Sequence, residues 1–299
     1  MSTSTKETSK EAYVKKYTII LALLALVLSL GFIGCDEEGE EADGEDTEET
    51  AEADGDLPVI AVNGSTTVTP IMQKVAEVYE GAELTISGTG SGDGIKALID
   101  NNCDVAMASR KMKDKEAEEA AANGVETEEV VIAKDGIAIV VHPDNPVEEL
   151  TMEQLKEIYL GNVSDWSEFG GSGEITVVTR ESSSGTFGVF SKLVMDKEPV
   201  VAEAVQQKSN GDVVRTVAGA EGAIGFIGLG YLDDSLKGVK IDGVTPSVET
   251  VVDGSYPISR DLNLYVPADH PEHVAALLEW IKSPEGQKIV EEEGFVPLN

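Results

Sequence analysis

The sequence predicts an α/β protein built around a mostly parallel sheet. Short apolar runs that are typical of strands alternate with segments in which apolar residues recur at helical spacing. Loops rich in glycine and hydroxyl residues connect several of these pairs. With 299 residues, 41% of them hydrophobic, the chain can bury a large core, in one large domain or in two of ordinary size.

The first run of alternating elements starts at Leu57. In "VTPIMQKVAEVYE", the apolar residues Val68, Ile71 and Val75 share one face of a helix. The expected elements are strands in residues 58–65, 83–88 and 104–109, helices in residues 68–80, 93–101 and 114–122, and two further strands within residues 130–143.

A second α/β set follows the turn-rich stretch "HPDNP" (His142–Pro146), which marks a boundary. Here Thr151 is placed to cap a helix that ends at Gly161. The remaining expected elements are strands in residues 174–179, 222–232 and 256–266 and helices in residues 187–195, 271–282 and 284–294. The chain shows no internal repeat.

The N-terminus has a secretory pattern. Lysines precede an apolar run from Ile19 to Ile33, and Cys35 follows it, as in a signal peptide. An uncleaved anchor is the alternative, although the run is short for a bilayer. The end of the run resembles a bacterial lipoprotein signal, with Phe32 where a leucine is usual. We therefore expect lipidation at Cys35 and an extracytoplasmic body tethered to the cell membrane, in the periplasm or at the cell surface.

The net charge of −34 is unevenly distributed. Asp36–Asp56 holds thirteen acidic residues in twenty-one positions and no basic one, which predicts a disordered, self-repelling tether. Residues 57–299 still hold 41 acidic and 18 basic residues. This balance argues against nucleic acid as a partner, because a polyphosphate backbone requires a basic surface.

The cysteine and histidine content gives little sign of metal or disulfide chemistry. With Cys35 lipidated, Cys103 has no disulfide partner and is expected to be a small buried residue. His270 and His273 lie three residues apart at the start of a helix, without further His or Cys beside them. We interpret them as surface residues rather than half of a metal site, and we expect no metal and no cofactor.

Three loops share one pattern: a strand, then glycine with serine or threonine, then a helix. They are "NGSTTVTP" (Asn63–Pro70), "SGTGSGDGI" (Ser87–Ile95) and "RESSSGTF" (Arg180–Phe187). Each places hydroxyls and free backbone N–H groups at a helix N-terminus, where the helix dipole favours an anion. Serine and threonine also cap helices for structural reasons alone. Three such loops in one chain, one of them led by an arginine, predict an anion site.

"RESSSGTF" could instead supply a serine nucleophile. It is not a G-x-S-x-G elbow, and the three histidines lie far from it in the sequence. The chain also lacks a dinucleotide fingerprint and a nucleotide-hydrolysing P-loop. These observations favour a binding protein over an enzyme, and a serine hydrolase or phosphatase is the rival hypothesis.

Six segments in order carry a resemblance to a known family: "NGSTTVTP", "SGTGSGDGI", "ASRKM", "TRESSSGTFGVF", "GAIGFIGLGYL" and "YPISRDLNLYV". Together they resemble the phosphate-binding lipoproteins of ABC phosphate importers, in the type II periplasmic-binding-protein class. The resemblance covers nearly all of residues 57–299. It implies a monomer with two α/β lobes, residues 57–140 with 253–299 and residues 141–252, joined by two crossing strands. Phosphate would be held between the lobes and passed to the transmembrane subunits of an ABC permease.

The resemblance also implies the phosphate contacts. They are Ser65, Thr66 and Thr67 of the first loop, Ser91 of the second, Ser109, and Arg180, Ser182, Ser184, Gly185 and Thr186 of the third. In this arrangement Arg180 would grip the anion with two parallel hydrogen bonds, while hydroxyls and amides fill the remaining acceptor positions.

One departure concerns selectivity. Relatives carry an aspartate where Arg110 and Ser182 stand here, and such a carboxylate accepts the proton that phosphate keeps and sulfate lacks. Asp93 and Glu181 are nearby candidates for this role, and Arg110 could add a second positive group. A receptor for another tetrahedral oxyanion, such as sulfate or molybdate, is therefore an alternative, as is a phosphate-sensing or adhesive lipoprotein without a transporter.

Overall fold

The computed structural model describes residues 57–298, and the predicted signal segment, Cys35 and the acidic tether lie outside them. The strands are β1 (Val59–Gly64), β2 (Glu83–Ser87), β3 (Val105–Ala108), β4 (Thr127–Val141), β5 (Glu149–Leu150), β6 (Thr176–Arg180), β7 (Val205–Gln207), β8 (Ala223–Gly228), β9 (Lys237–Ile241) and β10 (Ser259–Pro267). The helices are α2 (Thr69–Val78), α3 (Ser91–Ile99), α4 (Asp114–Ala122), α5 (Met152–Leu160), α6 (Gly185–Leu193), α7 (Asn210–Ala218), α8 (Val248–Val252), α9 (Glu272–Lys282) and α10 (Pro284–Glu292), with short 3₁₀ turns at Trp166–Phe169 and Leu229–Tyr231. No helix within residues 57–298 is long and apolar enough to span a membrane.

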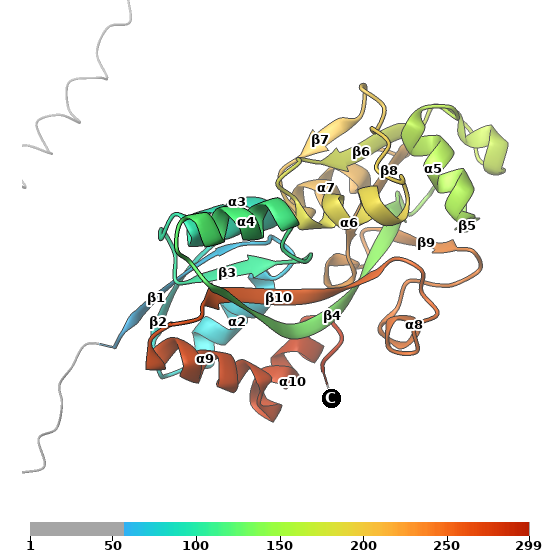
Figure 1. Cartoon of the computed structure of the whole chain (residues 1–299). Helices are drawn as coiled ribbons and strands as arrows, with labels where there is room; N and C mark the ends of the chain where they lie inside the picture. Colours follow the sequence, from blue (N-terminus) through green and yellow to red (C-terminus); the bar gives the residue numbers. More distant parts are fainter. Residues whose placement is uncertain (1–56, 299) are drawn as a thin grey trace, which may run out of the picture. The chain divides into compact units, whose positions relative to one another are not determined.

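The strands follow the order β2-β1-β3-β10-β4-β8-β6-β7, with β9 beside β4 and β5. At one end of this order β1 runs parallel to β2 and β3, and at the other end β6 runs parallel to β7 and β8. Between these ends, β4 and β10 are antiparallel and pair from Thr127 opposite Pro267 to Gly136 opposite Ser259. Figure 1 shows these two long strands passing between the two sets of elements. The arrangement confirms the predicted two-lobed α/β fold.

The structure differs from the sequence prediction in the number and direction of the strands, and it adds the unpredicted elements β5, β7, β9, α7 and α8. Residues 130–143 do not form two strands: β4 is one strand, which pairs first with β10 and then, from Ile137, with β8. The sheet is also mixed rather than mostly parallel, because β4 and β10 are antiparallel to their neighbours. The sequence reading missed α7, whose opening Asn-Gly reads as a turn, although Ser209 and Asp212 form a capping box there.

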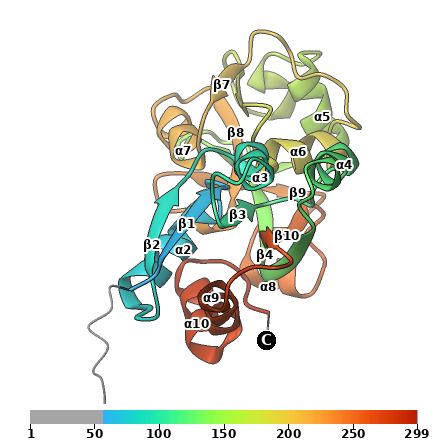
Figure 2. The ribbon, with the colours of Figure 1, turned by 60° about the vertical axis from the view of Figure 1, so that its left-hand side comes forward.

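Two large apolar cores flank the crossing strands. One joins α2, α9 and α10 to β1, β3, β10 and the first half of β4, and the other joins α5, α6 and α7 to β6, β8 and the second half of β4. A smaller cluster lies under α3 and α4, on the side of β10 opposite α9 and α10 (Figures 1 and 2). The exact lobe boundaries, near residues 140 and 253, stay a prediction.

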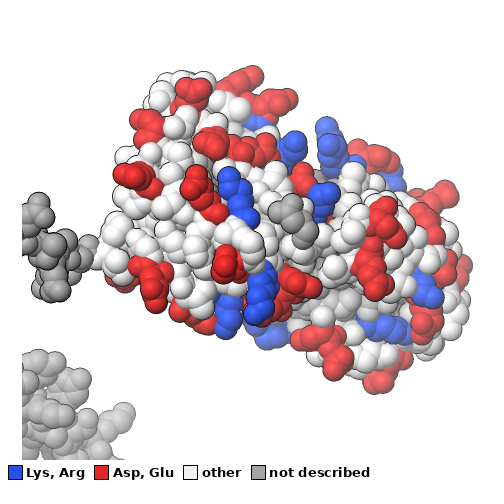
Figure 3. All heavy atoms as spheres, turned by 90° about the horizontal axis from the view of Figure 1, so that it is seen from below, with Lys and Arg blue, Asp and Glu red and all other residues white. Residues whose placement is uncertain are grey.

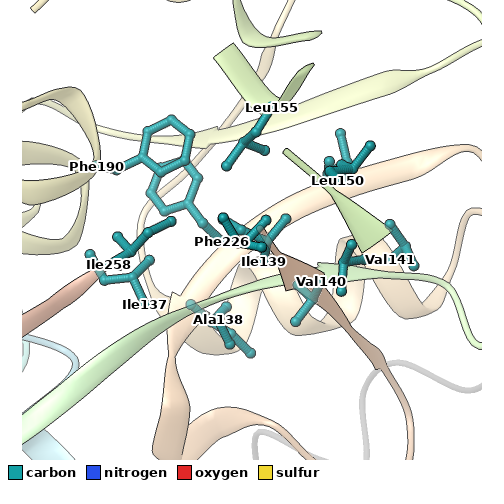
Figure 4. Close-up of a cluster of buried hydrophobic side chains, with 14 of the residues drawn as sticks. Ile137, Ala138, Ile139, Val140, Val141, Leu150, Leu155, Phe190, Phe226 and Ile258 are labelled. Atoms are coloured by element: carbon teal, nitrogen blue, oxygen red, sulfur yellow. The ribbon is translucent and has the colours of Figure 1, made fainter. Parts of the chain in front are cut away.

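The second core is built around aromatic packing, shown with its neighbours in Figure 4. The rings of Phe190 and Phe226 stack with centroids 4.1 Å apart, and Tyr159 lies 4.6 Å from Phe190. Such contacts join α5 and α6 to β8, so this core fixes the position at which α6 begins.

Truncating the stack should destabilise the protein. Phe226 is 1% exposed, so Phe226→Ala is expected to lower the free energy of unfolding by about 3–5 kcal/mol, measured by urea denaturation. Val252→Ala is the control, because Val252 is 62% exposed and should change stability by less than about 0.5 kcal/mol. A loss below about 1 kcal/mol for Phe226→Ala would show that this core does not stabilise the fold as described.

Candidate functional site

The three loops predicted to bind an anion meet in the structure. The first follows β1, the second opens α3, and the third joins β6 to α6. Gly64 ends β1 with φ +137°, and a Cβ there would collide with the backbone of Met107, so only glycine allows this close approach. Nine of the ten predicted contact residues are buried: Ser65, Thr66, Thr67, Ser91, Ser109, Arg180, Ser184, Gly185 and Thr186. Ser182 is exposed and lies outside this cluster.

Direct contacts join the loops of the two lobes. The hydroxyl oxygens of Thr67 and Thr186 are 3.1 Å apart, and the amide of Gly92 donates to the carbonyl of Ser183 over 2.9 Å. Gly185 packs so closely against Ser91 and Ser109 that a Cβ would collide with both hydroxyl oxygens. The first amides of α3 and α6 have no acceptor within their own helix. Those of Gly92 and Phe187 donate to Ser183 and Ser184, and the positive ends of both helix dipoles lie at the cluster.

Arg180 is the charged group of the cluster. Its Nε donates to the carbonyl of Gln207 over 3.2 Å, and its Nη2 donates to Lys208 O and Thr66 Oγ1 over 2.9 and 3.1 Å. Its Nη1 is buried without a partner, and no carboxylate among residues 57–298 forms an ion pair with it. Burial, and then the charge of Arg260, lowers the pKa of Arg180 to about 10, so the guanidinium remains charged at neutral pH.

A second buried arginine, Arg260, donates hydrogen bonds to two residues of the cluster. Arg260 pairs with Asp135 directly across β10 and β4, with Nη2–Oδ2 and Nε–Oδ2 distances of 2.7 and 3.0 Å. It also donates to the carbonyl of Ser109 and to Thr67 Oγ1. The second carboxylate oxygen accepts the amide of Leu229 over 2.9 Å. Burial raises the pKa of the Asp135 carboxyl, and the adjacent guanidinium opposes that rise.

Asn210 completes the set of buried polar residues. It opens α7 and donates from Nδ2 to Thr66 Oγ1 and Thr67 Oγ1, over 3.3 and 3.0 Å. Sequence reasoning did not select Asn210, Asp135 or Arg260. For Asp135 the available signal was a lone acid inside the apolar run "VVIAKDGIAIVV". Arg260 lay within a quoted segment, "YPISRDLNLYV", but was not singled out.

Arg110 is not a second positive group of the site, contrary to the sequence interpretation. Its guanidinium binds the carboxylate of Glu116 through two bonds of 2.7 and 2.8 Å, which neutralises its charge. Burial by itself would raise the pKa of Glu116, but hydrogen bonds from Arg110 and from the amide of Lys113 hold it below its ordinary value. Asp93 is exposed and Glu181 half-buried, and Asp135 is the only fully buried carboxylate within residues 57–298.

Comparison with known proteins identifies the family of this chain. A family model described as a PBP superfamily domain matches residues 40–285. The phosphate-binding protein PstS of Bacillus subtilis is 30% identical over 298 residues, covering 95% of each chain. The protein of the same name from Staphylococcus saprophyticus is 34% identical over 254 residues, covering 79% of each. The chain belongs to the phosphate-binding-protein family of the PBP superfamily.

Solved structures of this family agree in fold. A substrate-binding protein from Clostridium perfringens, solved with bound phosphate, superposes with a TM-score of 0.76 at 35% identity, covering 81% of this chain and all of that one. An ABC-type phosphate transport receptor from Vibrio cholerae gives 0.66 at 32% identity, covering 79% and 99%. The family consists of substrate-binding transport proteins.

The buried pair beneath the site yields a prediction for stability. Asp135→Leu leaves Arg260 without its counter-charge, so the free energy of unfolding should fall by about 3–5 kcal/mol in urea denaturation without added anion. The double variant Asp135→Leu/Arg260→Met removes both charges and should lose clearly less than the single variant. Equal losses of unfolding free energy in the two variants would show that the carboxylate does not stabilise the fold through its ion pair with Arg260.

Proposed function

We propose that this protein captures inorganic phosphate outside the cytoplasm and delivers it to an ABC permease. Relatives that are 30 and 34% identical are named phosphate-binding proteins, and a similar solved structure is named an ABC-type phosphate transport receptor. The observation that carries the proposal is Arg180. A guanidinium that is 2% exposed, with Nη1 unpartnered and no ion pair to a carboxylate of residues 57–298, is a buried charge that requires an anion.

The groups around Arg180 suit a tetrahedral oxyanion. Hydroxyls of Thr66, Ser91 and Thr186 come from three different loops, and two helix N-termini add backbone amides. Donors that converge from several directions fit four oxygen atoms better than a planar carboxylate. The hydroxyl set belongs to both lobes, so the ligand would be held between them.

The acidic surface does not oppose anion binding. Figure 3 shows acidic side chains spread over the face seen from below, with fewer lysines and arginines among them. Exposed charges more than about 8 Å away are largely screened at physiological salt, whereas a buried guanidinium acts in a low local dielectric. Arg180 and Arg260 together carry one positive charge more than Asp135 compensates.

The site favours binding without chemistry. Ser184 accepts the amide of Phe187 over 3.2 Å as the N-cap of α6, which gives its hydroxyl a structural role. The three histidines make no hydrogen bond to a site hydroxyl among residues 57–298, so no histidine is placed to act as a base on one of these hydroxyls. We therefore propose a receptor rather than a hydrolase, tethered to the membrane through Cys35 and without a resident cofactor.

Two buried arginines allow a matched test of the site. Arg180→Met should weaken phosphate binding by at least about a hundredfold, because the anion loses charge-assisted hydrogen bonds, as measured by titration calorimetry of the purified full chain. Arg110→Met removes a comparably buried arginine that Glu116 already neutralises, and it should keep affinity within about threefold of the unchanged protein. Phosphate affinity unchanged in Arg180→Met would refute the site, and absence of binding by the unchanged protein would refute the function.

A further inference from the structure

The orientation of the Asn210 side chain is determined by its surroundings. Asn210 is fully buried, and its Oδ1 accepts the amide of Gly228 over 3.2 Å. A backbone amide can only donate, so the side-chain oxygen must face Gly228 and the NH₂ group must face Thr66 and Thr67. The two hydrogens of this NH₂ group therefore go to the two threonine hydroxyls.

Thr66 is left with only its proton to offer. Its Oγ1 accepts from Asn210 Nδ2 over 3.3 Å and from Arg180 Nη2 over 3.1 Å. A hydroxyl oxygen has two acceptor positions, and these two bonds fill both of them. The proton of Thr66 finds no acceptor among residues 57–298, so this hydroxyl can serve a ligand as a donor.

Thr67 also accepts two hydrogen bonds, and this determines the direction of its bond to Thr186. Thr67 Oγ1 accepts from Asn210 Nδ2 over 3.0 Å and from Arg260 Nη2 over 3.3 Å. Its proton must therefore point to the Oγ1 of Thr186, 3.1 Å away. Thr186 accepts that bond, so its own proton is available to a ligand.

We propose that Asn210 is a positioning residue that, with Arg260, orients the threonine hydroxyls so that Thr66 and Thr186 present donors to the bound anion. This inference rests on the proposed function. It assigns the threonine side of the site to unprotonated phosphate oxygens. Ser91 Oγ accepts the amide of Ser109 over 3.0 Å, and the two hydroxyls, 3.3 Å apart, can donate to each other in either direction. In both cases one hydroxyl oxygen keeps a lone pair, which can accept the phosphate proton.

Asn210→Asp tests the direction of these bonds. The carboxylate replaces the NH₂ donor with an acceptor, so Thr66 and Thr67 turn their protons toward it. Thr66 then offers a lone pair to the ligand, and Thr67 offers one to Thr186, whose proton turns away from the ligand. Phosphate can donate a proton to such an acceptor, whereas sulfate has none to donate. Titration calorimetry should show that sulfate affinity falls at least about tenfold further than phosphate affinity.

Asn145→Asp is the matched control. Asn145 is also buried, but it binds Val147 and Glu221 away from the site, so its variant should keep the affinity for both anions. Equal losses of sulfate and phosphate in Asn210→Asp would overturn the inference and leave phosphate binding by the unchanged protein intact. Failure of the unchanged protein to bind phosphate would instead refute the proposed function.

Neutron diffraction from crystals of the unchanged protein with phosphate provides a second test that does not depend on a variant. The inference requires the Thr67 deuterium between Thr67 and Thr186, and the Thr66 and Thr186 deuteriums directed at phosphate oxygens. A Thr186 deuterium directed at Thr67 would overturn it, whatever the charge introduced by Asn210→Asp does to affinity.

Discussion

The ion pair between Asp135 and Arg260 is the interaction on which the site depends. It joins β4 to β10, the two strands that pass between the lobes, and both partners are buried. The guanidinium of Arg260 also donates to the hydroxyl of Thr67 and to the carbonyl of Ser109. The second carboxylate oxygen of Asp135 accepts the amide of Leu229. A buried pair that is fully hydrogen-bonded permits one arrangement of these elements and penalises others.

The pair also decides the charge that an anion encounters. Asp135 neutralises Arg260 and leaves the neighbouring Arg180 without compensation. The local surplus is a single positive charge in a protein whose formal net charge is −34. The positive charge of Arg180 is buried, whereas the acidic groups are mostly exposed and screened by salt. The interaction of an anion with Arg180 at short range therefore outweighs its repulsion by the acidic surface.

The sequence could reveal the parts of the site that are local. A hydroxyl beside glycine at the start of a helix is visible in the chain, so Thr66, Ser91 and Thr186 could be selected without a structure. Asp135 stands out only as a lone acid in an apolar run. Its partners could not be predicted, because Leu229 and Arg260 are 94 and 125 residues away and only the fold brings them together.

Arg110 shows the opposite error. Its partner Glu116 is only six residues away, yet the resemblance directed attention to the ligand rather than to this local pair. The fold class was predictable from alternating periodicity. The single strand β4 was not, because Gly136 looks like an interruption until β10 and β8 are seen to pair on either side of it.

The hydroxyl contacts also explain why binding and lobe closure belong to one event under the proposed function. Asn210 and Thr186 belong to elements of the second core, whereas Thr66 and Thr67 follow β1 of the first. The bonds that Asn210 and Thr186 form to these threonines are neutral, and each contributes only about 1 kcal/mol. An anion bonded to Arg180 and to both sets of hydroxyls adds charge-assisted bonds that exist only when the lobes meet. Under the proposed function, bound phosphate would therefore stabilise the arrangement in which the two lobes are in contact.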